Sequence, residues 1–198
     1  MKYLYLALGD SYTIGEQVLP EENFPNQTAL LLKGTITTPE IIATTGWTTD
    51  ELNAAIDAAN ILKQYDIVSL LIGVNNQYRG RTIENFEIEF EGLLQRAIQF
   101  ADNKPSHVFV LSIPDWGVTA FAEGRDSKKI AEEIDAYNNV CRLTAEKFNT
   151  HFIDITASQR EDGNKDDFLA EDKLHPSGKE YAKWAAKLAE AIKNVYNK

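Results

Sequence analysis

Five short, almost continuously apolar runs alternate along this chain with segments whose apolar residues recur at helical spacing. The runs cover residues 3–8, 40–44, 66–72, 107–113 and 151–155. Short unbroken runs of this kind are typical of strands that are covered on both faces, and a helix between successive strands favours parallel pairing. The alternation therefore predicts one parallel sheet of five strands with helices on both of its faces.

The helical segments show recognisable starts and apolar faces. One begins at a capping box formed by Thr48 and Glu51, and its apolar face extends to Leu62. The last helix is expected to begin at Ser177, with Glu180 three residues further on. Two other helices are expected around residues 83–97 and 130–148.

Length and charge limit the architecture and the partners. The chain has 198 residues and no internal repeat, low-complexity tract or linker, so we expect residues 1–198 to form a single domain. The formal net charge of −10 argues against nucleic acid and against an anionic membrane surface as partners. The single cysteine, Cys141, excludes an internal disulfide and a zinc site of several cysteines.

The N-terminal residues MKYLYLALGD are interpreted as the first strand rather than as a signal peptide. No apolar segment is long enough to span a bilayer, so stable membrane insertion is not expected. These features favour the cytoplasm, although a signal segment removed before residue 1 would change this expectation. The sequence does not specify an oligomeric state.

In open parallel sheets, ligands bind in the crevice beyond the carboxyl ends of the strands. The residues that follow each predicted strand are therefore the ones to inspect for chemistry. They are mostly small and polar, and comprise residues 9–11, 44–46, 73–76, 114–117 and 172–176. The polar residues thus fall where this fold class places a site.

Of the three histidines, His175 is the strongest candidate for a reactive group. Asp172 lies three residues before it in a loop that enters the last helix, so its carboxylate can reach the imidazole and fix the tautomer. His107 and His151 each open a predicted strand and are interpreted as structural. The D-x-x-H pattern alone also fits a loop histidine beside a charge.

Acyl transfer also requires a nucleophile and donors for the developing oxyanion. Ser11 provides a hydroxyl after the first strand, Gly46 an unobstructed backbone N–H, and Asn75 a side-chain amide. Each residue alone has an ordinary explanation as a helix cap, a turn or an Asx-turn. Their joint placement at three strand ends favours a serine hydrolase over these separate explanations.

Four sequence blocks resemble those of the SGNH hydrolases, also called the GDSL esterase/lipase superfamily. The blocks are GDSYTIG, the glycine of TTGWT, GVNN and DKLHP, and they occur in the family's order from residue 9 to 176. The resemblance implies a flavodoxin-like, three-layer α/β/α fold. It also implies a carboxylic ester hydrolase with no metal and no organic cofactor.

The resemblance further assigns roles to individual residues. Ser11 would be the nucleophile, His175 the base and then the acid, and Asp172 the residue that orients His175. The oxyanion donors would be the Ser11 and Gly46 backbone amides and the Asn75 side chain. Asp10 is expected to brace the turn that presents Ser11.

Two blocks differ from the family's usual form. The first reads GDSY rather than GDSL, which leaves the nucleophile in place. In the third, Asn76 replaces a carboxylate that normally braces the loop, so the bracing and the substrate preference are in question.

The substrate is less clearly encoded than the reaction. Aromatic side chains near strand ends are candidates to line an acyl pocket, or equally to pack in the core: Tyr12, Trp47, Tyr78, Trp116 and Phe121. Arg79 and Arg81, close to Asn75, either meet an anionic or sugar substrate or are solvated charges. We expect short-chain acyl or acetyl esters as small-molecule substrates, acetylated carbohydrates among them.

Three alternatives remain open at this stage. The chain could be a lysophospholipase or thioesterase of the same superfamily. From another class, it could be a flavodoxin-like module that cradles a phosphate or nucleotide on its first loop. It could also be a catalytically inactive interaction domain on the same scaffold.

Overall fold

The computed structural model describes residues 2–196, and within them five strands form one all-parallel sheet. The strands are β1 (Tyr5–Gly9), β2 (Glu40–Ala43), β3 (Ile67–Leu71), β4 (Val108–Leu111) and β5 (His151–Ile153), in the order β2-β1-β3-β4-β5. Each strand lies in one of the five apolar runs, with β1 extended by one residue. The predicted parallel sheet is therefore confirmed.

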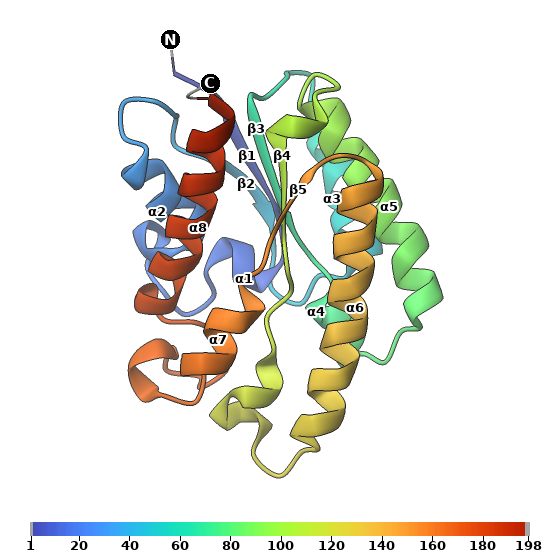
Figure 1. Cartoon of the computed structure of the whole chain (residues 1–198), viewed down its shortest axis with the longest axis vertical. Coiled ribbons are helices and arrows are strands. Elements are labelled where there is room, and N and C mark those ends of the chain that lie inside the picture. The colour runs from blue at the N-terminus through green and yellow to red at the C-terminus, as the bar shows by residue number, and fades with distance from the viewer. Residues whose placement is uncertain (1, 197–198) are drawn as a thin grey trace.

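Helices cover both faces of the sheet (Figure 1). One layer contains α2 (Phe24–Leu31) and α8 (Gly178–Tyr196), which pack against each other, and the other contains α3 (Thr49–Ala59), α5 (Ile83–Phe100) and α6 (Ser127–Lys147). The shorter helices α1 (Ser11–Ile14), α4 (Val74–Tyr78) and α7 (Thr156–Asp162) lie towards the carboxyl ends of the strands. This arrangement is the expected three-layer α/β/α fold.

The central strands are buried because both faces are covered. Every residue of β1 and of β3 is buried, whereas the edge strand β2 begins with the exposed Glu40. Large aromatic side chains fill the two interfaces between sheet and helices: Phe24, Tyr181 and Trp184 come from α2 and α8, and Phe86 and Phe90 from α5. Continuous apolar character in the sequence thus corresponds to burial on both sides.

The predicted start of α3 is correct, but its predicted apolar face is too long. The Thr48 backbone N–H donates to Glu51 Oε2 at 2.8 Å, as in a capping box. The helix ends at Ala59 because Asn60 adopts the left-handed conformation, with φ of 46°. Leu62 lies beyond this end and is 88% exposed.

The second predicted capping box, at the start of α8, is wrong. Ser177 Oγ donates to the Asp167 carbonyl at 2.7 Å instead of capping the helix. Glu180 is buried, and its Oε1 accepts hydrogen bonds from Trp184 Nε1 at 2.9 Å and Ser158 Oγ at 3.0 Å. The spacing of Ser177 and Glu180 was compatible with a cap, but a buried partner one turn along the helix takes the carboxylate.

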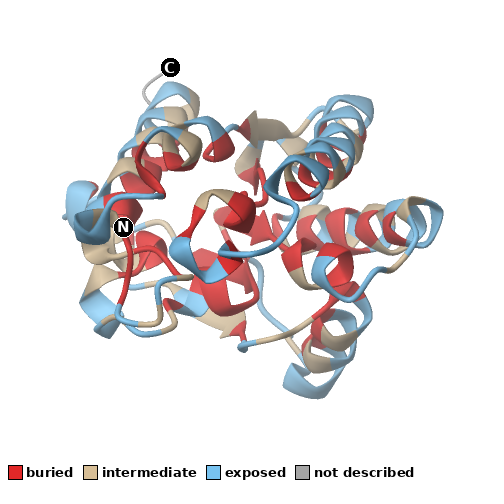
Figure 2. Cartoon of the chain, turned by 90° about the horizontal axis from the view of Figure 1, so that it is seen from below, coloured by how far each residue is buried: buried red, intermediate tan, exposed pale blue. Residues whose placement is uncertain are grey.

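The order of the strands creates a crevice between β1 and β3. The chain leaves β1 for β2 on one side, and β3, β4 and β5 then continue on the other side, so β1 and β3 flank the topological switch point. Figure 2 looks onto the edge where the strands end. Gly9 ends β1 here, and a side chain at this position would lie 2.4 Å from the Leu71 carbonyl oxygen. A glycine is therefore required for the chain to turn into α1.

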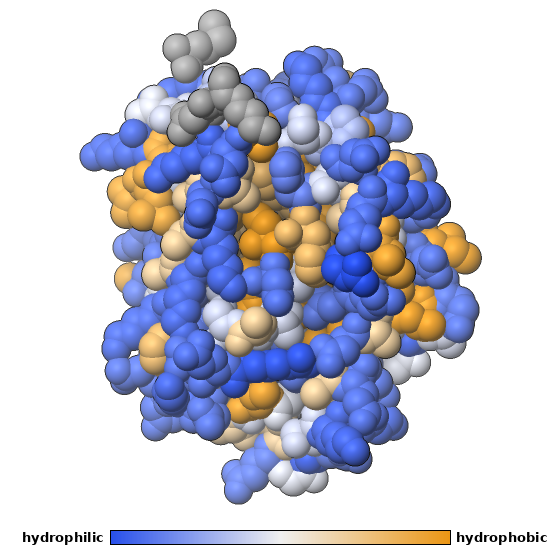
Figure 3. Space-filling view, viewed as in Figure 1, coloured by the Kyte–Doolittle hydropathy of each residue, from blue (hydrophilic) through white to orange (hydrophobic). Residues whose placement is uncertain are grey.

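Hydrophilic side chains cover most of the face shown in Figure 3. Within residues 2–196, no helix combines the length and the apolar character needed to cross a membrane.

Candidate active site

Ser11, His175 and Asp172 form a hydrogen-bonded row at the carboxyl edge of the sheet. Ser11 Oγ lies 2.9 Å from His175 Nε2, and His175 Nδ1 lies 2.5 Å from Asp172 Oδ2. Ser11 and His175 are 3% and 6% exposed, so the row is largely shielded from bulk water. Ser11 is separated from Asp172 and His175 by more than 160 positions in the sequence, and the fold brings them together.

The loop that carries His175 is held in a fixed turn. Asp172 Oδ1 accepts hydrogen bonds from the backbone N–H groups of Leu174 and His175, both at 3.0 Å. The Ala170 N–H donates to the His175 carbonyl at 2.8 Å and closes the loop. The Asp172 carboxylate therefore shapes the loop with one oxygen and orients the imidazole with the other.

The environment of Asp172 favours its ionised form. Partial burial acts to raise the pKa of the carboxyl group, but hydrogen bonds from the His175 ring and from the His175 and Leu174 backbone outweigh it. The net effect is a pKa below the usual value of an aspartate. An ionised Asp172 is suited to stabilise an imidazolium at His175.

Asp10 braces the turn that presents Ser11, as expected. Its Oδ1 accepts a hydrogen bond from the Tyr12 N–H at 3.0 Å and so caps α1. The side chain is fully buried, and this burial raises the pKa of Asp10 to about 7 despite the hydrogen bonds from Tyr12 and Asn75. The loop thus contains a carboxyl group that takes up a proton near neutral pH.

Asn75 and Gly46 face the same crevice as Ser11. Asn75 Nδ2 donates to the Trp47 carbonyl at 3.0 Å and makes a longer contact of 3.4 Å with Asp10 Oδ2. Gly46 has a φ of 86°, a left-handed conformation that favours glycine. The structure therefore brings both expected oxyanion donors to the Ser11 cavity.

The two arginines near Asn75 are engaged in the protein itself. Arg79 Nη2 donates to the Gly46 carbonyl at 2.6 Å, and its Nη1 lies 3.3 Å from Glu51. Arg81 pairs with Asp50 at 2.7 Å. Arg79 thus fixes the glycine loop from outside, and neither guanidinium faces the cavity as a free cation.

Asn76 braces the loop in spite of lacking a negative charge. Its side chain is fully buried, Oδ1 accepts a hydrogen bond from the Thr49 N–H at 3.1 Å, and Nδ2 donates to Thr49 Oγ1 at 2.6 Å. An amide satisfies both a donor and an acceptor on Thr49, whereas a carboxylate could only accept. The two hydrogen bonds between Asn76 and Thr49 therefore brace the loop, although the carboxylate that is usual at this position is absent.

A cavity of about 200 Å³ opens beside Ser11. Of the five aromatic residues that were candidates to line a pocket, four do so: Tyr12, Tyr78, Trp116 and Phe121. Trp47 is not among the lining residues, and it contributes its backbone carbonyl to Asn75 instead. The remaining walls are formed by Ser11, Thr45, Gly46, Val74, Asn75, Leu174 and His175.

The outer wall of this cavity is a segment that follows β4, here called the rim and defined as residues 116–125. Trp116 Nε1 donates to Gln77 Oε1 at 2.8 Å, which ties the rim to α4. The Phe121 N–H donates to the Lys173 carbonyl at 3.1 Å, which ties it to the histidine loop. Sequence inspection missed Gln77 and Arg125, because these contacts join segments that are distant along the chain.

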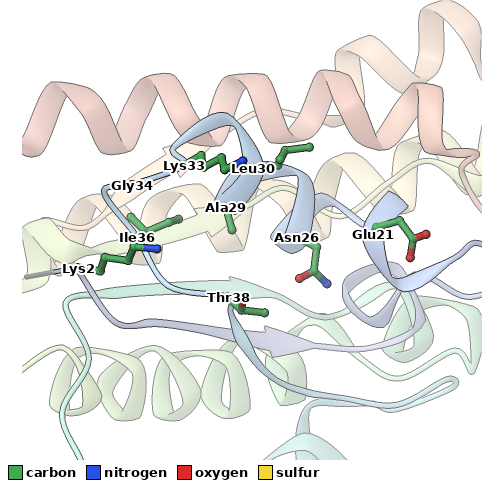
Figure 4. Close-up of a pocket in the computed structure, with 9 residues that line it drawn as sticks. All are labelled: Lys2, Glu21, Asn26, Ala29, Leu30, Lys33, Gly34, Ile36 and Thr38. Atoms are coloured by element: carbon green, nitrogen blue, oxygen red, sulfur yellow. The ribbon is translucent and has the colours of Figure 1, made fainter.

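A second cavity, of about 370 Å³, lies between α2 and residues 33–38 (Figure 4). Its charged and polar lining side chains are Lys2, Glu21, Asn26, Lys33 and Thr38. It contains no histidine and no serine, so its greater volume does not make it a site for acyl transfer. Within residues 2–196, no cluster of three or more His, Cys, Asp or Glu side chains is arranged to hold a metal ion.

The chain is similar to known proteins in sequence pattern and in fold. The model of the GDSL-like lipase/acylhydrolase family matches residues 7–194. Among solved structures, the psychrotrophic esterase EstA from Pseudoalteromonas sp. has a TM-score of 0.75 at 15% identity, with all of both chains covered. The lipase/acylhydrolase from Enterococcus faecalis has a TM-score of 0.74 at 20% identity, covering 98% of this chain and 96% of the other.

An acetylxylan esterase, Axe2 from Geobacillus stearothermophilus, has a TM-score of 0.70 at 20% identity, covering 98% of this chain and 93% of the other. At these identities the structural similarity shows a shared fold. No curated protein sequence matches the chain.

Proposed function

This chain belongs to the GDSL-like lipase/acylhydrolase family, and we propose that it hydrolyses short-chain esters through an acyl-enzyme formed on Ser11. The observation that carries the proposal is the hydrogen-bonded row from Ser11 through His175 to Asp172, with contacts of 2.9 and 2.5 Å. A hydroxyl, an imidazole and an ionised carboxylate in this order are the components of nucleophilic acyl transfer.

In the first half of the reaction, Ser11 Oγ attacks the ester carbonyl carbon while its proton passes to His175 Nε2. Asp172 accepts the hydrogen bond from Nδ1–H and stabilises the imidazolium that results. The carbonyl oxygen becomes negatively charged in the tetrahedral intermediate. When this intermediate collapses, the bond to the alcohol oxygen breaks, and His175 returns its proton to that oxygen.

The developing oxyanion is stabilised by hydrogen-bond donors that line the cavity beside Ser11. We assign this role to the backbone N–H groups of Ser11 and Gly46 and to Asn75 Nδ2. The long contact of 3.4 Å between Asn75 and Asp10 leaves one amide hydrogen weakly held. That hydrogen is available to the oxyanion at little cost, while the 3.0 Å bond to Trp47 keeps the amide in place.

In the second half, water replaces the alcohol. His175 Nε2 takes a proton from the water, whose oxygen attacks the acyl carbon of the ester on Ser11. The intermediate then collapses, the carboxylic acid leaves, and Ser11 Oγ recovers a proton from His175. Every proton is transferred through the imidazole, so these steps require no group beyond this chain and water.

The size of the cavity supports short acyl chains. About 200 Å³ is below the roughly 300–1,000 Å³ of sites that enclose drug-sized ligands, and a long fatty acyl chain would extend out of it. The aromatic rings of the rim are suited to pack against a sugar, and one structural neighbour is an acetylxylan esterase. We therefore include acetylated carbohydrates among the proposed substrates, ahead of lysophospholipids and long-chain thioesters.

A phosphate-binding module is not favoured by the first loop. Helix α1 has only four residues, and the Tyr12 N–H at its start already donates to Asp10. The buried carboxyl of Asp10 also disfavours a bound anion at this position. The Tyr12, Thr13 and Ile14 N–H groups all donate to Asp10, so three of the backbone donors that could cradle a phosphate on this loop are already used.

The proposal is tested with p-nitrophenyl esters from acetate to palmitate. The wild-type chain is expected to hydrolyse acetate with the highest kcat/KM, and Ser11→Ala to lower this value by about 10⁴-fold or more. Ser106→Ala serves as the matched control, because Ser106 is exposed and precedes β4, at the opposite end of that strand from the site. Acetate hydrolysis by Ser11→Ala at close to the wild-type rate would disprove the proposal, and a preference for palmitate would disprove the proposed chain length.

A further inference from the structure

Arg125 occupies an unusual position over the rim of the Ser11 cavity. Its guanidinium carbon lies 5.4 Å from the ring centroid of Tyr78 and 5.2 Å from those of Trp116 and Phe121. All three rings line the cavity. The cation therefore sits at the mouth of the site, supported by ring faces that attract positive charge.

Arg125 also differs from the other arginines in its electrostatic partners. The remaining five each form an ion pair with a carboxylate: Arg79, Arg81, Arg96, Arg142 and Arg160. Within the described part of the chain, no carboxylate oxygen lies within 4 Å of the Arg125 side-chain nitrogens. Arg125 is therefore the one arginine of the described residues without a carboxylate partner, in a chain that has 30 acidic residues.

The hydrogen-bonding capacity of this guanidinium is almost unused. Its one side-chain hydrogen bond to residues 2–196 runs from Nη2 to the Tyr78 hydroxyl, at a long 3.4 Å. A guanidinium has five N–H donors arranged to hold a carboxylate or phosphate with two parallel bonds. Arg125 is exposed, so these donors are accessible to a bound molecule.

The position of the rim indicates which part of a substrate Arg125 would meet. Phe121 is bonded through its N–H to the Lys173 carbonyl, in the same loop as His175. Since His175 gives its proton to the leaving oxygen, the alcohol lies on the side of the cavity bordered by this loop. Phe121, and the Arg125 cation stacked on it, thus border the alcohol side.

We propose that Arg125, stacked on Tyr78, Trp116 and Phe121, is a specificity-determining residue that selects esters whose alcohol carries an anionic group. This inference rests on the proposed function and deepens it by naming the class of substrate. A carboxylate or phosphate on the alcohol would take the donors of Arg125, while the acyl group stays in the small cavity at Ser11.

The test compares esters that share an acetyl group and differ in the charge of the alcohol. The anionic probes are 3- and 4-acetoxybenzoate, and the neutral counterparts are their methyl esters. Arg125→Gln is expected to lower kcat/KM for at least one anionic ester by roughly 10-fold or more, the effect of losing a charge-assisted hydrogen bond. Its kcat/KM for the neutral esters should stay within about twofold of wild type.

A matched control removes the same charge elsewhere. Arg142 lies on α6, about 22 Å along the helix from its first residue, Ser127, at 1.5 Å per residue. Arg142→Gln should leave the preference for the anionic ester unchanged. Arg125→Lys should retain part of the preference, because it keeps the charge and loses the paired donors. Added salt should weaken wild-type hydrolysis of the anionic ester alone.

The inference is overturned if Arg125→Gln affects both kinds of ester equally or neither, or if Arg142→Gln has the same effect. Ser11→Ala, measured on the neutral esters, separates this failure from failure of the proposed function. If hydrolysis of the neutral esters requires Ser11 but the preference for anionic esters does not require Arg125, only the proposed role of Arg125 is wrong. If the neutral esters are hydrolysed without Ser11, or not at all by the wild-type chain, the proposed function itself is wrong.

Discussion

The two walls of the Ser11 cavity are built in different ways. At the strand ends, Ser11 and His175 are buried and joined by hydrogen bonds, and the loops that carry them are capped by Asp10 and Asp172. On the rim side, the Tyr78 and Phe121 side chains are 48% and 38% exposed. There, contacts between rings and with a guanidinium join Tyr78, Trp116 and Phe121, and hydrogen bonds to Gln77 and to the Lys173 carbonyl anchor the rim.

This difference separates the chemistry from the selection of substrate. The buried wall positions reacting groups to within hydrogen-bond distance, so a single substitution there should reduce turnover. On the rim side, the Tyr78 and Phe121 side chains are exposed enough to change without disturbing the fold, whereas Trp116 is buried. We therefore expect substitutions in the buried wall to change kcat and substitutions in the rim to change the ratio of kcat/KM between substrates.

Among the substitutions that test this difference between the walls, Asp172→Asn is expected to have the largest effect on kcat. The substitution retains an oxygen to accept from the Leu174 and His175 N–H groups but presents an amide to His175 Nδ1. The imidazole should adopt the wrong tautomer, and kcat should fall by about 10³–10⁴-fold. Steady-state kinetics and thermal unfolding measure the two consequences separately. A kcat within tenfold of wild type in a folded variant would mean that Asp172 only shapes the loop.

The next effect contrasts two neighbouring residues of the buried wall. Asn75→Ala removes a proposed oxyanion donor, and kcat should fall by about 10²–10³-fold with little change in the free energy of unfolding. Asn76→Ala instead leaves the Thr49 N–H without its partner and should lower the free energy of unfolding by about 1–3 kcal/mol.

These two variants are measured side by side by steady-state kinetics and by urea unfolding. Equal losses of kcat in both would indicate that the loop acts as a unit and that Asn75 has no separate role. If Asn75→Ala lowers the free energy of unfolding as much as Asn76→Ala does, Asn75 likewise has no role separate from that of the loop.

A smaller effect is expected from the rim. Phe121→Ala removes a partly exposed ring from the cavity wall and should enlarge the site. The ratio of kcat/KM for p-nitrophenyl hexanoate to that for acetate should rise by about 10-fold, which corresponds to the added contact of one or a few methylene groups. The rate of acetate hydrolysis should change little. An unchanged ratio together with a collapse of kcat on both esters would show that the rim is part of the catalytic wall.

The smallest expected effect is a pH dependence of the free energy of unfolding that is caused by the buried carboxyl group of Asp10. Its pKa is about 7 in the folded chain against an ordinary 3.8, so the folded state retains a proton that the unfolded state releases between these values. The folded wild-type chain should therefore lose stability as pH rises from about 4 towards 7. Asp10→Asn lacks this contribution because it does not titrate.

Urea unfolding of wild type and Asp10→Asn at pH 5 and pH 8 measures this effect. From pH 5 to pH 8, the free energy of unfolding of wild type should fall by more than about 1 kcal/mol relative to that of Asp10→Asn. A difference that is constant with pH would show that Asp10 ionises normally inside the protein.

The two walls also differ in how well the sequence predicted them. Ser11, Gly46 and Asn75 each follow a strand, and the parallel sheet brings strand ends together, so short motifs were sufficient to place them. The His175 loop comes after α7, and its D-x-x-H spacing and the family resemblance identified it. The position of Arg125 over Tyr78 depends on contacts between α4 and a segment more than 40 residues later, which no local pattern encodes.

Two sequence-based predictions about helices were wrong because, as with Arg125, the deciding feature is not part of the local pattern. Leu62 fitted the apolar spacing of α3, but Asn60 ends that helix through its left-handed backbone. Glu180 fitted a capping box, but Trp184 and Ser158 bind its carboxylate in the interior. Periodicity and caps predict that an element exists, whereas tertiary contacts decide where it ends and which partner a polar side chain takes.

The central claim is that His175 and Asp172 activate Ser11, and covalent labelling with a fluorophosphonate tests it most directly. Mass spectrometry should find one adduct per chain, on the peptide that contains Ser11. Labelling should be absent in Ser11→Ala and strongly slowed in Asp172→Asn. A folded wild-type chain that is not labelled, or equal labelling of wild type and Ser11→Ala, would contradict the claim.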